Sequence, residues 1–255
     1  MIYDKLSIIF LSIIASEKKD STNSQIATYI LNHRCQLKNI GIKEMAAECN
    51  VAISSISRFC KEIGLRDFAE LKNLLISTNL HFEKLSTLNS NNERLFEYKE
   101  KINDSIKMVV DSIDMESIAK LCDDIYNYQN IAIFGLLKAG GVALNLQCDL
   151  LMLGKQTYTN ISYLQQIKYL LNADDKTLII IFSYTGSYFD YHDTRILKKF
   201  IKNPKIWLIS SCKKNYLPSI INYITFNSLH DQASHPYQLQ FIAGLIAQEY
   251  SQRYK

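Results

Sequence analysis

The chain has 255 residues, of which 47% are hydrophobic, and it contains only 8 glycines and 3 prolines. This composition excludes a wholly disordered chain and a glycine- or proline-rich fibrous protein, and the length corresponds to one or two domains. Lys and Arg number 29 against 25 Asp and Glu, a net charge of +4. Such a charge permits nucleic-acid binding but does not indicate a densely basic, non-specific binder.

An apolar run, Ile8 to Ala15, lies near the N-terminus. A secretory signal is one interpretation, but Asp4 lies in the would-be basic region, and the run is too short to span a membrane. The six cysteines form no C-x-x-C pair and are expected to be reduced, so we expect a soluble, cytoplasmic protein with no membrane partner. The apolar positions share one helical face, which predicts an amphipathic first helix: Leu6, Ile9, Phe10, Ile13 and Ile14.

Short helices are predicted throughout the first 80 residues, at about 26–31, 42–49, 54–63 and 68–80. Asp67 is expected to cap the last of these. A polar stretch without periodicity, Ser86 to Asn92, marks a linker at residues 81–92. We therefore expect one domain at 1–80 and a second at 93–255.

The pattern at residues 42–63 is typical of a helix-turn-helix. Ala46 and Ala47 allow close helix packing, Asn50 suits a left-handed turn, and Ser54 is expected to cap the second helix. A small helical bundle with a merely solvated third helix is the alternative. Serine hydroxyls reach phosphates or bases and arginine can fork onto guanine, so the outward face supplies the candidate DNA contacts: Ser54, Ser55, Ser57, Arg58 and Lys61.

The same stretch closely resembles the helix-turn-helix domain of RpiR-type transcription regulators. The resemblance covers about residues 1–78, and its most specific part is the run from Ser57 to Lys61. It implies a DNA-binding domain that acts on a double-stranded operator as a dimer or higher oligomer. The matching positions are Ile42, Met45, Ala46, Val51, Ala52, Ser54, Ser55, Ile56, Ser57, Arg58, Phe59, Cys60, Lys61, Ile63, Gly64, Leu65, Phe68, Leu71 and Lys72.

From residue 93 onward, two predicted helices are followed by short apolar runs that alternate with helical segments. Such alternation is typical of a parallel sheet flanked by helices, so the fold class is a helical N-terminal domain plus an α/β C-terminal domain. Helices are predicted at about 93–113, 115–128, 142–152, 162–171, 190–202 and 237–250. The predicted strands are Ile131–Phe134, Leu178–Phe182, Ile206–Ile209 and, less clearly marked, Gln156–Tyr158 and Tyr223–Phe226.

RpiR-type regulators carry a sugar isomerase (SIS) domain in this position, and two loops resemble its signatures. Gly135 keeps the first glycine of Gly-x-Gly-x-Ser, but Leu137 and Ala139 replace the second glycine and the serine. The second signature, Ser-x-Ser-Gly-x-Thr, reads Ser183 to Tyr188 here. Hydroxyls and backbone N–H groups at a helix start favour phosphate, and Lys138 can add charge. The candidate ligand-binding residues are Ser183, Tyr184, Thr185, Gly186, Ser187, Gly135 and Lys138.

We therefore expect a transcription regulator whose SIS-like domain dimerises, or forms tetramers, and senses a phosphorylated sugar. Two alternatives stay open: a phosphosugar isomerase, for which no general base stands out, and a regulator with a ligand-free oligomerisation scaffold. We expect no catalytic residue, cofactor or metal, because the spacing of His230 and His235 fits no ligand motif. His235 is a possible ligand contact, whereas Cys212 has no recognisable base and is expected to be structural.

Overall fold

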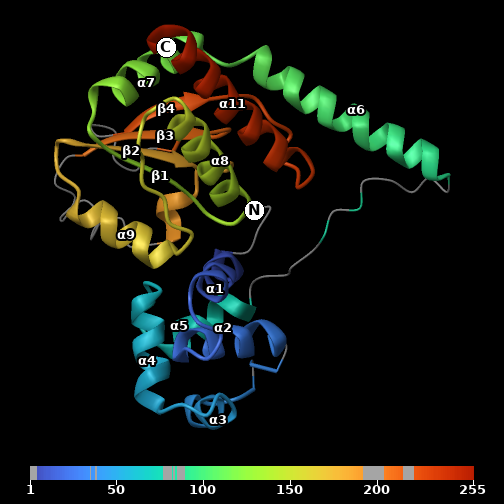
Figure 1. The fold of residues 1–255 in the computed structure, drawn as a ribbon. Coiled ribbons are helices and arrows are strands. Elements are labelled where there is room, and N and C mark those ends of the chain that lie inside the picture. Colours follow the sequence, from blue (N-terminus) through green and yellow to red (C-terminus); the bar gives the residue numbers. More distant parts are fainter. Residues whose placement is uncertain are drawn as a thin grey trace.

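The computed structural model describes residues 5–34, 36–37, 39–76, 82, 84, 90–191, 204–214 and 221–255. A cluster of short helices forms the N-terminal part, and a sheet covered by helices forms the C-terminal part (Figure 1). No helix in these ranges combines the length and the apolar character needed to cross a bilayer.

The N-terminal helices pack around one apolar core. The face predicted for the first helix is confirmed, because Leu6, Ile9, Phe10 and Ile13 are at most 1% exposed. Phe10 stacks on Phe59 with 5.9 Å between ring centroids, which joins the first helix to the fourth. The helices are α1 (Lys5–Ser16), α2 (Thr22–Asn32), α3 (Ile42–Glu48), α4 (Ile53–Glu62) and α5 (Phe68–Ile76).

The turn between α3 and α4 has the predicted backbone shape. Asn50 has a φ of 52°, the left-handed conformation that ends a helix. The expectation that Ser54 caps α4 is wrong: the N-cap is Ala52, and Ser54 lies inside the first turn. Asp67 does cap the next helix, since its carboxylate accepts from the N–H of Glu70 at 2.9 Å.

The C-terminal domain contains a parallel sheet with strand order β1-β2-β3-β4, which confirms the predicted class. The central β2 is buried along its whole length because helices cover both faces. The prediction of a strand at Gln156–Tyr158 is wrong, since Tyr158 forms an isolated bridge with Ala132 instead. The strands are β1 (Asn130–Gly135), β2 (Thr177–Phe182), β3 (Lys205–Ser210) and β4 (Ile221–Thr225).

The two faces of the sheet are covered by different helices, because successive strand side chains point to opposite sides. Ile131 and Ile133 face a core shared with α7 (Met115–Asn127), α8 (Lys138–Met152) and α11 (Ser234–Tyr254). Ala132 and Phe134 face α9 (Tyr163–Asn172), in a core that continues into the helix-turn-helix domain. The two domains are therefore packed against each other.

Helix α6 (Asn91–Val110) extends away from the sheet (Figure 1), and the Tyr98 hydroxyl in its N-terminal half lies 2.9 Å from that of Tyr237 in α11. Leu95 and Phe96 on this half are 68% and 61% exposed. The helix predicted at residues 190–202 lies outside the described residues from 192 onward. Its described beginning is a single 3-10 turn, η1 (Tyr188–Tyr191).

Candidate DNA-binding surface and effector cleft

Helix α4 separates an apolar face from a polar one. Ile56 and Phe59 are fully buried in the helix-turn-helix core. Arg58 carries an exposed guanidinium, 3.6 Å from the carboxylate of Glu62. Two cations and three hydroxyls on one helix suit phosphate and base contacts. Of the five predicted DNA contacts, Ser54, Arg58 and Lys61 are exposed, and Ser55 and Ser57 are half-buried.

The two signature loops lie side by side at the carboxyl ends of β1 and β2. The strand register pairs Gly135 with Phe182, so the loops begin next to each other. Ligands of open α/β sheets bind outside this end of the strands. The cavity between the loops measures about 50 Å³ and is lined by Leu136, Ala139, Phe182, Ser183, Tyr184, Thr185, Tyr188 and His235.

The first loop is shaped by backbone packing. A Cβ on Gly135 would lie 2.4 Å from the carbonyl oxygen of Ala139, so a glycine is needed for the close approach of α8. Leu137 has a φ of 50°, a conformation that favours glycine. Lys138 is exposed and its ammonium donates to the carbonyl of Gln232 at 3.2 Å, which directs it toward the start of α11.

The second loop is internally hydrogen-bonded. The Ser183 hydroxyl accepts from the Tyr188 N–H at 3.1 Å, and Thr185 donates to the Ser187 hydroxyl at 3.0 Å. The loop leads into η1, and the helix expected after it lies outside the described residues from 192 onward. The sequence interpretation missed Lys214, whose ammonium lies 3.0 Å from the Ser187 hydroxyl. The two consecutive lysines that follow β3 were the available signal for this charge.

Aromatic rings occupy much of the cleft. Tyr184 stacks on His235 with 4.4 Å between centroids, and its hydroxyl donates to Gln238 at 3.1 Å. Tyr188 is 1% exposed, and its hydroxyl donates to the side-chain amide oxygen of Gln166 at 2.9 Å. Burial, reinforced by the charge of Lys138, lowers the pKa of His235 to about 3, so this imidazole is neutral near pH 7. The cleft thus presents neutral rings beside the hydroxyls of the second loop.

A cysteine and a histidine meet at the end of β3. The Cys212 sulfur lies 3.7 Å from Nε2 of His230, and the Ser211 hydroxyl lies 3.2 Å from Nδ1 of the same ring. Sequence reasoning found no base for Cys212, because His230 is 18 residues away and reaches it through the fold.

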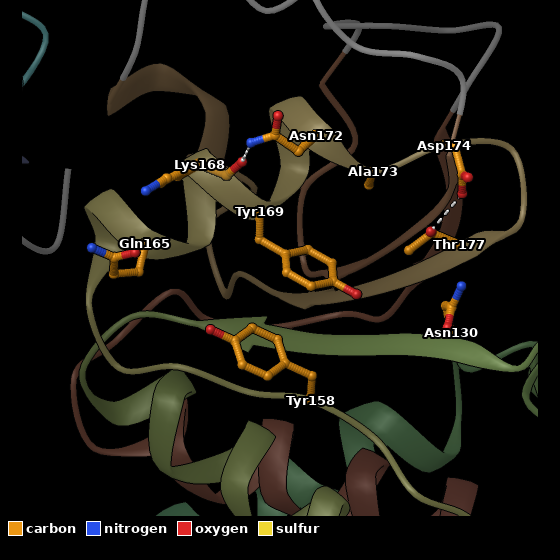
Figure 2. Close-up of a pocket in the computed structure, with 9 residues that line it drawn as sticks. All are labelled: Asn130, Tyr158, Gln165, Lys168, Tyr169, Asn172, Ala173, Asp174 and Thr177. Atoms are coloured by element: carbon orange, nitrogen blue, oxygen red, sulfur yellow. Dashed lines mark hydrogen bonds between the residues drawn. The ribbon is translucent and has the colours of Figure 1, made fainter.

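A larger cavity, of about 390 Å³, opens at the opposite end of the strands (Figure 2). Tyr158 and Tyr169 face each other there in a stack with 4.9 Å between centroids. Asn130 and Thr177 on its wall begin β1 and β2, so it lies at the amino ends of the strands. None of the predicted ligand residues lines this cavity.

Comparison with known proteins gives one family match and several similar proteins. Residues 9–79 match the helix-turn-helix domain of the rpiR family. A segment of 127 residues is 29% identical to an uncharacterised HTH-type transcriptional regulator of Caldanaerobacter subterraneus subsp. tengcongensis. That match covers 48% of this chain and 45% of the relative, so it spans less than half of the relative's length.

Two solved structures share the fold. The Vibrio vulnificus NanR protein, in complex with ManNAc-6P, superposes with a TM-score of 0.56 at 14% identity over 98% of this chain and 92% of its own. A putative sugar-phosphate isomerase of Listeria monocytogenes superposes with a TM-score of 0.53 at 9% identity, over 64% and 91% of the two chains.

The architecture is that of a helix-turn-helix domain followed by an α/β domain whose fold is shared with these two proteins. Residues 9–79 are similar to the helix-turn-helix domain of the rpiR family, which agrees with the resemblance seen at residues 42–72. The C-terminal part shares its fold with the putative sugar-phosphate isomerase, which confirms the predicted α/β class.

Proposed function

We propose that this protein is a transcription regulator that binds an operator through α4. The observation that carries the proposal is that α4, within the segment that matches the rpiR family, has a buried face and an exposed face. Ile56 and Phe59 are buried, while Arg58 and Lys61 are exposed. The relative from Caldanaerobacter subterraneus is named as a transcriptional regulator, which supports this function. A DNA operator as partner would be met in the cytoplasm, which is the location that we propose.

We expect Arg58→Ala to weaken operator binding by about 1–3 kcal/mol, because a base or phosphate contact is lost. Its pair with Glu62 is exposed and contributes little, so the fold should remain intact. Fluorescence anisotropy with an operator found by selection from random duplexes measures the effect. Arg66→Ala removes the same charge outside α4 and is the matched control. Equal affinities of the Arg58 variant and the unaltered protein would remove Arg58 from the DNA contacts.

We propose further that the protein acts as a dimer or tetramer through α6. One recognition helix reads a few base pairs, and two copies on a palindromic site supply the remaining affinity. Leu95 and Phe96 give α6 an exposed apolar face. Helix α11, the other helix considered for this interface, buries Leu239 and Ile242 within its own subunit. Helix α6 is therefore the stronger candidate.

The effector of the SIS-type domain is proposed to be a phosphorylated sugar bound at the second loop. Ser183, Thr185 and Ser187 supply hydroxyls there, and the Lys214 ammonium, which is also paired with Asp190 at 2.6 Å, lies beside them. The solved NanR protein holds ManNAc-6P, which makes this ligand class the first to test. The cavity, at about 50 Å³, is much smaller than the roughly 300–1,000 Å³ typical of ligand pockets. A sugar phosphate therefore requires Tyr184 or Tyr188 to move.

Replacing both Ser183 and Thr185 by alanine should abolish the thermal shift that sugar phosphates produce, while operator binding is retained. The reason is that both hydroxyls lie on the cavity wall, far along the chain from α4. Differential scanning fluorimetry with hexose and pentose phosphates measures the shift, and Thr185→Ser, which keeps a hydroxyl, is the control. Absence of a shift in the unaltered protein would instead support the second candidate, a ligand-free oligomerisation scaffold, which the small cavity favours.

An isomerase function is less well supported. Proton transfer between sugar carbons needs a general base within hydrogen-bond reach. The described lining residues of the cleft include no carboxylate, and His235 is stacked on Tyr184 with a pKa of about 3. A regulator therefore fits the described cleft better than an enzyme.

A further inference from the structure

Both signature loops are hydrogen-bonded to one fully buried side chain, Gln166 of α9. Its amide nitrogen donates to the carbonyl of Gly135 in the first loop at 2.8 Å. Its amide oxygen accepts from the hydroxyl of Tyr188, which follows the second loop, at 2.9 Å. The same amide nitrogen donates its second hydrogen to the carbonyl of Asn160 at 2.6 Å, in the turn that precedes α9. A change in either loop therefore alters the hydrogen bonding of α9.

The same end of α9 is held by the helix-turn-helix domain. The Ser12 hydroxyl of α1, 1% exposed, accepts from the N–H of Tyr163 at 2.9 Å. It donates to the carbonyl of Ile161 at 2.9 Å, so it caps the start of α9 from another domain. Tyr163 also packs edge-on against Tyr188, with 6.0 Å between centroids. Four side chains thus connect the cleft to α1: Tyr188, Gln166, Tyr163 and Ser12.

We propose that α9 transmits the state of the effector cleft to the DNA-binding domain through Gln166 and the Ser12 cap. This inference rests on the proposed function, because it assigns regulation to the same cleft. Tyr188 is one of the two tyrosines on the cavity wall, and a ligand that displaces it removes its hydroxyl from Gln166. The buried amide must then find new partners, since an unpaired buried polar group is costly. The turn at Asn160 and the Ser12 contact shift with it.

The placement of α4 shows which kind of regulation this contact allows. Ser54 and Arg58 stay exposed while α1 is docked on α9. The docked state therefore leaves the DNA-reading face accessible. Regulation would act by changing the orientation of the helix-turn-helix domain, and hence the spacing of two recognition helices in an oligomer.

Tyr188→Phe tests the coupling without requiring a known effector, because it removes the bond to Gln166 and keeps the ring. We expect the amides of α1 to exchange with deuterium about two- to tenfold faster in this variant, the usual range for one lost hydrogen bond. Hydrogen-exchange mass spectrometry on the full chain measures peptides of residues 6–16. Tyr250→Phe, a buried tyrosine on the opposite face of the sheet, is the matched control and should leave α1 unchanged.

The Ser12→Ala variant, alone and combined with Tyr188→Phe, completes a double-mutant cycle. If the contact carries the coupling, α1 exchanges faster in Ser12→Ala, and adding Tyr188→Phe produces no further increase. Unchanged α1 exchange in Tyr188→Phe, or independent effects of the two substitutions, would overturn the proposal. Neither readout uses DNA or sugar, so failure of operator binding or of the sugar-phosphate shift is recognised separately.

Discussion

Phe59→Ala is expected to destabilise the helix-turn-helix domain by about 3–5 kcal/mol and to abolish operator binding. The ring is fully buried and stacked on Phe10, so its removal leaves a cavity between α4 and α1. Domains are stable by only about 5–15 kcal/mol, so most of the stability of this small domain is lost. Urea denaturation followed by circular dichroism measures the change.

The control for this substitution lies on the same helix. Ile53 is 44% exposed, so Ile53→Ala removes a similar apolar side chain without opening a buried cavity. It should cost less than about 1 kcal/mol. If the two variants unfold at the same denaturant concentration, α4 is not packed through Phe59 as described, and the helix-turn-helix geometry needs revision.

Gly186→Ala is expected to cost about 2–5 kcal/mol and to remove any effector binding. Gly186 has a φ of +68°, and a Cβ there would lie 2.6 Å from the carbonyl oxygen of Cys212. The left-handed backbone accounts for about 1–2 kcal/mol, and the overlap for about 1–3 kcal/mol more. The second loop must then move away from the end of β3, which displaces the hydroxyls proposed to bind phosphate.

The matched control is Gly141→Ala, in the interior of α8. A Cβ on Gly141 meets no atom within 4 Å, so the replacement should be neutral or stabilise by up to about 1 kcal/mol through helix propensity. Thermal unfolding compares the two variants directly. A Gly186 variant that melts at the same temperature as the Gly141 variant would contradict the close packing of this loop.

Local patterns carried most of the fold prediction. The burial of Phe10 and Phe59, the left-handed Asn50 and the strand β2 all follow from apolar periodicity and turn preference, which act within a few residues. The errors also concern local structure, at the start of one helix and at one short predicted strand. Ala52 is the N-cap in place of Ser54, so α4 begins two residues earlier than a Ser54 cap would allow, and Tyr158 reaches β1 through a single bridge.

The cleft was predictable only in part. The positions of Ser183 and Gly135 follow from where parallel strands end, so their proximity was accessible from sequence. Contacts between distant segments were not: Lys214 reaches Ser187 from the end of another strand, and His230 approaches Cys212 from a later loop. The filling of the cleft by Tyr188 was equally hidden, since this buried ring reaches Gln166 of α9, which is 22 residues away in the sequence.

Leu137 gives the first loop a chemical character of its own. The residue keeps a backbone conformation typical of glycine, at a cost of order 1–3 kcal/mol that the surrounding packing must offset. The loop therefore retains its path although the residue that would make that path easy has been replaced. Because the leucine side chain is 37% exposed, a molecule approaching this loop meets hydrocarbon instead of bare peptide groups. Since Leu137 is not among the residues that line the cavity, this hydrocarbon forms part of the outer surface of the loop, beside the cleft.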